Sequence, residues 1–292
     1  MALTLVEAAK LMQDDVQAGV IFNTYLANPL VGLLPFENIP GSAYVYTRAP
    51  GVGTVSNTRA INADYTEETV GFTRLTASLG RLGGKAQVDN FLQVTGSDIN
   101  DQLAAQIAAK SKYTGIAFQN QFFNGDVATD ANGFDGLKKL LTGTSQETLD
   151  ALTMITLADI DSLLLSLDSD ASALFMNDKT LLKINALAKG SGMLAFNSIE
   201  TVGTRISTYG GVPIYRAGKL GTNASILADG EVYAVRFGVD GVHGIQASTP
   251  EAKLISPDQN ASAPVWTARI DWYAGIAQKA LQSAARVTKK IV

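Results

Sequence analysis

Residues 97–123, SDINDQLAAQIAAKSKYTGIAFQNQFF, form the longest helical pattern in the chain. Their apolar positions share one face, and the many alanines let a neighbouring element approach closely. This face consists of Ile99, Leu103, Ile107 and Phe118. Thr95 or Ser97 can cap the start, and NGDVATDANGFDGL at 124–137 supplies Asn-Gly and Asp-Gly turn signals at the end. The sequence therefore predicts a long helix over 97–123 that runs into a tight turn.

The segment before residue 44 contains two patterns. Residues 4–18 predict a short amphipathic helix. The apolar stretch 21–41 is broken by prolines at positions 29, 35 and 40, and loops exposed to water are rarely so apolar. Two interpretations stay open: this arm packs on its own core, or it packs on a neighbouring subunit.

Residues 44–80 are rich in threonine, aromatic and β-branched residues and have no helical stripe. They predict two strands, Tyr44–Arg48 and Val70–Leu79, joined by a polar middle rich in Gly, Asn and Asp. A long hairpin with so few core candidates does not stabilise itself in isolation, so another surface must lie beneath it.

Two helices with a buried strand between them are predicted next. The first begins at Thr156, where Asp159 completes a pattern like a capping box. The second is capped by Asn177 and stopped by Gly190, and ASALFMN between the helices reads as a short buried strand. The inward positions are Leu157, Ile160, Leu164 and Leu167 in the first helix and Leu181 and Ile184 in the second. This alternation predicts an α/β region over about 151–237.

The C-terminal third consists of strand patterns. SILADGEVYAVRF, GVHGIQAS and PVWTARIDWYAGIAQ begin at positions 225, 241 and 264. The last pattern alternates cleanly between two faces. One face carries Trp266, Ala268, Ile270 and Trp272, and the other carries Thr267, Arg269 and Asp271. Because both tryptophans share one face of a strand, packing in a core or interface explains them better than stacking on a ligand.

The composition of the 292 residues excludes several classes of protein. With no cysteine and one histidine, the chain cannot hold disulfides, thiol nucleophiles, or thiolate and paired-histidine zinc sites. The net charge of −4 comes without basic clustering, which argues against binding nucleic acid through its phosphates. No apolar run reaches the about 18 residues of a membrane span, and the N-terminus lacks a secretory signal pattern. Since 46% of residues are hydrophobic and 17% charged, we expect part of the surface to be buried against other subunits.

A search for chemistry yields no convincing site. GVGTVS at 51–56 lacks the third glycine of a dinucleotide fingerprint, and 124–135 fails the EF-hand spacing at Phe134. His243 has no nucleophile or metal partner nearby in sequence, so a structural role is expected. Two carboxylate pairs are interpreted as solvated: Asp159 with Asp161, and Glu67 with Glu68. We predict no catalytic, cofactor-binding or metal-binding residues and no enzymatic activity.

Four stretches follow, in order, the pattern of a known family. FFNGDVATDANGFDGL (122–137) resembles a turn after a spine helix, and ALFMNDKTLLKI (173–184) a strand that enters a helix, with Asp178 where proline is common. YGGVPIYRAG (209–218) is similar to a Gly-x-Pro-hydrophobic strand, and VWTARIDWYAGIAQKALQSAARV (265–287) to a closing strand. Over almost its whole length the chain resembles the major capsid proteins of tailed bacteriophages, the Hong Kong 97-type fold that encapsulin shells share.

The resemblance implies an α+β fold and a structural role. It implies a major capsid protein of the virion, whose copies assemble in the host cytoplasm into pentamers and hexamers of an icosahedral head around double-stranded DNA, without sequence-specific binding. A portal, a decoration protein and a scaffolding protein are possible partners; no cofactor or membrane is implied. The implied domains are an N-terminal arm (1–43), an extended β-hairpin loop (44–84), a peripheral domain (85–150 and 238–278) with a spine helix (97–123), and an axial domain (151–237 and 279–292).

Two departures from the family pattern matter. Some members join subunits by an isopeptide bond from a lysine on the extended loop, but residues 44–84 contain no lysine, so we expect non-covalent shells. Other members carry a long N-terminal scaffolding segment; here Met1 leads almost directly into the arm, so a scaffold, if used, is expected to be a separate protein.

Three alternatives stay open. An encapsulin-type compartment would contain a protein cargo instead of DNA. Another structural protein, such as a tail tube or surface-layer subunit, would form tubes or sheets. An enzyme with an unrecognised α/β fold would need a pocket with convergent titratable groups.

Overall fold

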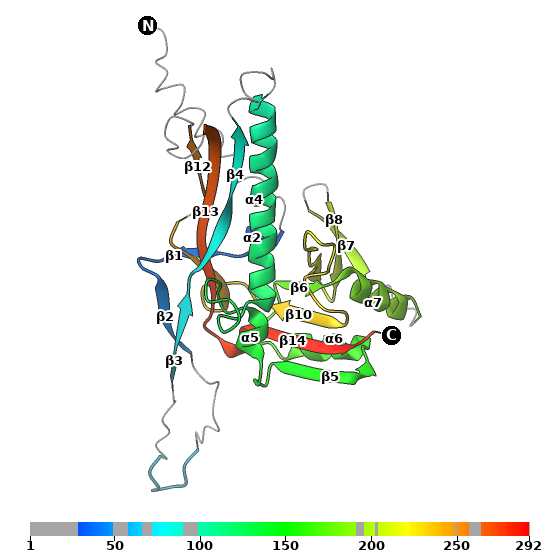
Figure 1. Cartoon of the computed structure of the whole chain (residues 1–292). Coiled ribbons are helices and arrows are strands. Elements are labelled where there is room, and N and C mark those ends of the chain that lie inside the picture. The colour runs from blue at the N-terminus through cyan, green and yellow to red at the C-terminus, as the bar shows by residue number, and fades with distance from the viewer. Residues whose placement is uncertain are drawn as a thin grey trace.

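The computed structural model describes residues 29–48, 58–65, 72–89, 99–190, 196–201, 204–248, 250–256 and 264–291. The helix predicted over 4–18, the GVGTVS motif and the pair Glu67 and Glu68 lie outside these residues. The fold is α+β, as predicted: one long helix stands beside two sheets and a separate two-stranded ribbon (Figure 1). Within the described part, no helix is both long and apolar enough to cross a membrane.

The long helix α4 spans Ile99–Asn124 and confirms the helix predicted over 97–123. Its C-terminal half buries three phenylalanines completely: Phe118, Phe122 and Phe123. The ring of Phe118 packs on Trp272 of the adjacent sheet, with centroids 4.7 Å apart. Aromatic rings in such contact add to the free energy of burial. These contacts fix α4 along the sheet, and Figure 1 shows the helix running beside β4 and β13.

The sheet beside α4 has five strands, of which β13 (Val265–Gln278) is the longest. β13 pairs antiparallel with β4 from Val265↔Asp89 to Ala274↔Gly80, and with β11 and β12 along its other edge. Its predicted alternation holds where Ala268, Ile270 and Trp272 are buried. The other strands are β1 (Phe36–Asn38), β4 (Gly80–Asp89), β11 (Val242–Gln246) and β12 (Glu251–Ile255).

The second sheet has seven strands in the order β5-β14-β10-β6-β9-β8-β7. Helices α6 (Leu157–Leu165) and α7 (Asp178–Gly190) pack on one of its faces. Both predicted caps are present, since Thr156 and Asp159 form a capping box and the Asn177 Oδ1 accepts from the Thr180 N–H at 2.7 Å. The strands are β5 (Glu147–Met154), β6 (Ala173–Met176), β7 (Phe196–Thr201), β8 (Thr204–Tyr209), β9 (Val212–Arg216), β10 (Glu231–Val235) and β14 (Ala284–Lys290).

The seven-stranded sheet separates two cores because successive side chains of a strand point to opposite faces. On β6, Ala173 and Phe175 join the first core, under α4, the five-stranded sheet and the short helix α5 (Leu137–Leu141). Leu174 and Met176 join the second core, under α6 and α7. α6 contributes Leu163 to this core more fully than the predicted Leu164, which is only partly buried.

The described part of the arm packs on its own body. Prolines break the apolar stretch as predicted, but α2 (Pro29–Leu33) buries Leu30 and Val31 in the first core, and β1 pairs parallel with β11. The interpretation that this arm is buried only on neighbouring copies is therefore wrong for residues 29–39. Burial of a leucine or valine side chain stabilises the folded chain by about 1.5–3 kcal/mol, and the chain's own core provides that burial.

Several strands were not predicted, and β4 shows why. Its sequence GRLGGKAQVD is poor in strand-forming residues. The structure explains the glycine at 83, since a Cβ there would collide with the backbone carbonyl of Ile270 on β13. The strand predicted from 225 is also shorter than expected. It begins only at Glu231, because Gly230 adopts a left-handed φ of 81°.

Candidate assembly surfaces

His243 lies inside the molecule and not in a cleft. Its side chain is 1% exposed, and its ring packs edge-on against Tyr44 with centroids 5.8 Å apart. The Nε2 atom is 3.6 Å from a carboxylate oxygen of Glu37, which is too far for a hydrogen bond. Burial, assisted by the charge of Lys279, lowers the pKa of His243, while the charges of Glu37 and Asp240 oppose this. The environment is that of a neutral, packed imidazole.

The lowered pKa of His243 predicts a pH-dependent stability. The unfolded chain gains this proton near pH 6.5, but the folded chain gains it only at lower pH, so the unfolded state binds more protons and stability falls as the pH drops below 6.5. In urea unfolding at about pH 7.5 and about pH 5.5, His243→Asn should lose less stability on acidification than the unaltered chain. Parallel losses in both proteins would contradict this expectation.

In the turn after α4, aspartate side chains accept hydrogen bonds from backbone N–H groups. Asp126 accepts from the Ala128 N–H, Asp130 from the Asn132 N–H and Asp135 from the Val127 N–H, at 2.9 to 3.0 Å. Phe134 is buried in the first core. The interpretation of 124–135 as turn chemistry agrees with this geometry. Among the described residues, no group of three or more His, Cys, Asp or Glu side chains could hold a metal ion.

The interpretation of Asp159 and Asp161 as a solvated pair is wrong for Asp159, whose side chain is only 20% exposed, whereas Asp161 is exposed. Asp159 pairs with Lys289 at 2.9 Å; burial opposes ionisation of this carboxyl, but hydrogen bonds from Lys289 and Thr156 outweigh burial and lower its pKa. Asp161 accepts a hydrogen bond of 2.7 Å from the hydroxyl of Tyr209. Burial and this carboxylate raise the pKa of Tyr209 to about 12. Both aspartates connect α6 to strands of the sheet.

Trp266 and Trp272 do not form a stacking platform. Trp272 is fully buried and its Nε1 donates to Gln246 at 3.3 Å, whereas Trp266 is half-buried near the start of β13.

A cavity of about 20 Å³ beside Tyr46 and Phe134 has the size of one water molecule. That no residue is catalytic stays a prediction, and the features that stand out are surfaces.

The first surface is the ribbon formed by β2 (Ala43–Arg48) and β3 (Thr73–Ser78), which confirms the predicted hairpin strands. Its base is fastened to the body, since Tyr46 joins a small core with Ile245 and the guanidinium of Arg48 donates to the Gln278 carbonyl at 3.0 Å. Beyond the base, the ribbon extends away from α4 and both sheets (Figure 1).

The far end of this ribbon carries apolar side chains in a defined turn. The Ala63 N–H donates to the Ala60 carbonyl at 3.1 Å, which places Ile61 in the turn with 93% of it exposed. The guanidinium of Arg59 lies 5.3 Å over the ring of Tyr65. Tyr65 is also mostly exposed, and so is Phe72, which directly precedes β3. Exposed apolar side chains on a projecting element are typical of a contact surface.

The second surface is β5, which lies at the edge of the seven-stranded sheet. Three large apolar side chains are exposed there: Leu149, Leu152 and Met154. Asp150 accepts from the Leu152 and Thr153 N–H groups, and the pairing with β14 shifts register at this point. Irregularities of this kind limit uncontrolled pairing at a sheet edge.

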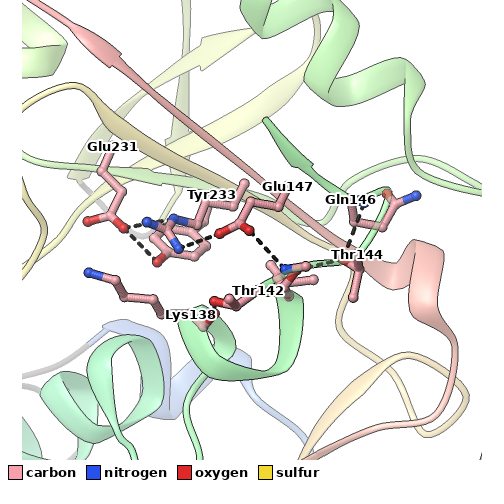
Figure 2. Close-up of polar contacts among 10 residues, drawn as sticks. Lys138, Thr142, Thr144, Gln146, Glu147, Glu231 and Tyr233 are labelled. Carbon is pink, nitrogen blue, oxygen red and sulfur yellow. Dashed lines mark hydrogen bonds and ion pairs between the residues drawn. The ribbon is translucent and has the colours of Figure 1, made fainter. Parts of the chain in front are cut away.

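A buried ionic cluster connects β5 to the interior of the same sheet. The Nη1 atom of Arg286 donates to Glu147 at 2.9 Å, and its Nε lies 2.9 Å from Glu231, an ion pair by distance without hydrogen-bond alignment. All three side chains are at most 6% exposed. The hydroxyl of Tyr233 donates to Glu231 at 2.9 Å, and burial together with this carboxylate raises the pKa of Tyr233. Figure 2 shows Glu147, Tyr233 and Glu231 along one line of contacts.

The cluster also holds the turn that leads from α5 into β5. The second carboxylate oxygen of Glu147 accepts from the Gly143 N–H at 3.0 Å, and Gly143 has a φ of 75°, which favours glycine. α5 belongs to the first core through Leu137 and Leu141. Arg286 therefore joins strands β5, β10 and β14. Through Glu147 it also holds the turn between α5 and β5.

Comparison with known proteins identifies the fold through structure alone. No family model and no curated protein matches the sequence. Among solved structures, an encapsulin complex from Synechococcus elongatus PCC 7942 has 14% identity and a TM-score of 0.68, with 90% of this chain and 88% of that chain covered. The capsid of an empty GTA particle has 16% identity and a TM-score of 0.60, with 89% of each chain covered. A structure from Mycobacterium phage Ogopogo has 15% identity and a TM-score of 0.59, with 89% and 91% covered. The chain has the Hong Kong 97-type capsid fold.

Proposed function

We propose that this chain is the major capsid protein of a tailed bacteriophage, a structural subunit without enzymatic activity whose pentamers and hexamers build an icosahedral head around double-stranded DNA. The ribbon carries this proposal. A two-stranded ribbon is at best marginally stable alone, and this one exposes Ile61, Tyr65 and Phe72 beyond its base. Another copy of the chain offers the surface that the ribbon needs.

The proposed domains follow the same pattern. The arm would comprise 1–43 and the extended loop 44–84, although β4 crosses the boundary at 84 and joins the ribbon directly to the sheet. In this proposal α4 and most of the five-stranded sheet would form the peripheral domain, and most of the seven-stranded sheet would form the axial domain. The net charge of −4 neither favours nor opposes a shell that is filled with DNA by a motor. Separate scaffolding, portal and decoration proteins are the partners that this function would use.

An encapsulin-type compartment is the second candidate. The TM-score of 0.68 with an encapsulin complex, against 0.60 and 0.59 with the GTA capsid and the phage structure, favours it. The two candidates share one fold and differ in what the particle contains. Both candidates require a homo-oligomeric shell.

Electron microscopy of the purified chain tests the proposed function. We expect closed, roughly spherical particles that contain nuclease-protected DNA when they are isolated from the native host. A protein cargo without DNA would favour the encapsulin alternative. Tubes, flat sheets or a chain that never assembles would contradict both shell functions.

The absence of lysine from residues 44–84 predicts shells without covalent crosslinks through the ribbon. After boiling in detergent, assembled particles should give a single band at 30.8 kDa on a denaturing gel. Particles heated with and without reductant should look alike, because the chain has no cysteine. A ladder of covalent multimers would contradict the expectation of non-covalent shells.

A further inference from the structure

Helix α6 leaves one acidic face uncovered. Its inward side is in the second core, while Leu165 is 84% exposed. The exposed residues follow the spacing i, i+3, i+4 and i+7, which places them on one face of the helix. They are Ala158, Asp161, Ser162 and Leu165. Residues 157–170 contain four aspartates and no basic residue, and two of the four, at 159 and 168, pair with Lys289 and Arg236. The α6 face is an exposed leucine in an acidic surface.

Helix α7 leaves a face of the opposite charge uncovered. Leu182 is 68% exposed, and the exposed residues follow the spacing i, i+3, i+7 and i+10. They are Lys179, Leu182, Ala186 and Lys189. Residues 178–190 contain three lysines and one aspartate, a net charge of +2. That aspartate, Asp178, lies within 4 Å of two further cations, Arg216 and Lys219. Lys179 pairs with Asp229 at 2.8 Å, but the cations around this face still outnumber the carboxylates. The α7 face is therefore an exposed leucine in a basic surface.

We infer that the α6 face of one copy docks on the α7 face of a neighbouring copy of this chain. The two faces are complementary in charge, and each carries one large exposed leucine that contact with the other face would bury. Both helices pack on the same face of the seven-stranded sheet (Figure 1), so every copy carries both halves of the contact. The inference deepens the proposed shell function and rests on it, because a second copy is the partner.

In a ring of the proposed shell this contact is head-to-tail, because each copy turns its α6 face to one neighbour and its α7 face to the other. Such a contact leaves the α7 face of the first copy open for a third copy, so it repeats until the rotation closes a ring. Two α6 faces repel each other because both are acidic, and two α7 faces repel each other because both are basic. The pairing therefore determines the direction in which subunits join.

The test exchanges charge at the two leucines. Leu165→Lys puts a cation opposite the basic α7 face, and Leu182→Glu puts an anion opposite the acidic α6 face. Each single variant should raise the concentration for half-maximal self-association, measured by sedimentation, by about tenfold. The double variant should recover most of this loss, because lysine then faces glutamate. Val239→Lys and Val239→Glu, at another exposed apolar position, are the matched controls. Circular dichroism checks that every variant is folded.

The outcomes separate the contact from the shell function. Single variants that associate like the unaltered chain, or a double variant at least as weak as the singles, would overturn the contact even if closed particles form. An unaltered chain that stays monomeric would overturn it too. Charge rescue in small oligomers without closed particles would support the contact while the proposed shell function fails.

Discussion

Replacing Arg286 by methionine should lower the free energy of unfolding by about 3–5 kcal/mol, because it leaves Glu147 and Glu231 buried without their shared cation. Methionine keeps much of the arginine stem, so the loss of packing is small and the loss of charge compensation dominates. Urea unfolding, followed by tyrosine and tryptophan fluorescence with all proteins in the same state of assembly, measures the change.

The matched control removes an arginine from an ion pair at the surface. Arg269 and Asp271 lie 2.7 Å apart on β13 and are 53% and 38% exposed, so Arg269→Met should cost at most about 1 kcal/mol. Adding Glu147→Gln and Glu231→Gln to Arg286→Met should recover part of the lost stability, since neutral amides are less costly to bury than carboxylates. If Arg286→Met and Arg269→Met cost the same, the buried cluster does not have the proposed structural role.

Replacing both Ile61 and Phe72 by aspartate should abolish particle assembly at concentrations where the unaltered chain assembles. Both side chains are large, apolar and exposed, and a partner that buries them loses this contact and meets two charges instead. Loss of such central apolar contacts weakens association by about 2 kcal/mol or more. Light scattering against protein concentration, with electron microscopy of the products, measures the effect.

The folded subunit itself should tolerate these two replacements. Both side chains face water, so each change should alter the free energy of unfolding by no more than about 0.5 kcal/mol. Val239→Asp, the same kind of replacement at an exposed valine between β10 and β11, should leave assembly intact. Normal particles from the ribbon variant would refute the role of the ribbon in assembly.

Local sequence patterns predicted the elements that depend on neighbouring residues. The capping box at Thr156, the cap at Asn177, the buried strand Ala173–Met176 and the long helix all follow from spacings of a few positions, where backbone hydrogen bonds and side-chain periodicity act. The hairpin strands were found for the same reason. Strands that need glycine for close approach, such as β4, have no such local signal.

The candidate surfaces were only partly visible in the sequence. The ribbon was expected to need a partner surface, but its exposed tip at Ile61 depends on a turn that the sequence did not reveal. The arm illustrates the opposite case: its apolar composition fits burial on the chain's own core and on a neighbour equally well. Burial of Leu30 in the first core decided this for residues 29–39.

The amino-acid sequence by itself determined the class of fold, the long helix with its terminating turn, and the exclusion of cysteine and paired-histidine chemistry. Only the tertiary structure decided how the strands pair, where Arg286 meets Glu147, 139 positions earlier, and which leucines of α6 and α7 stay exposed. The reason is physical: periodicity places a side chain on a face, but the face that water reaches depends on residues far away along the chain.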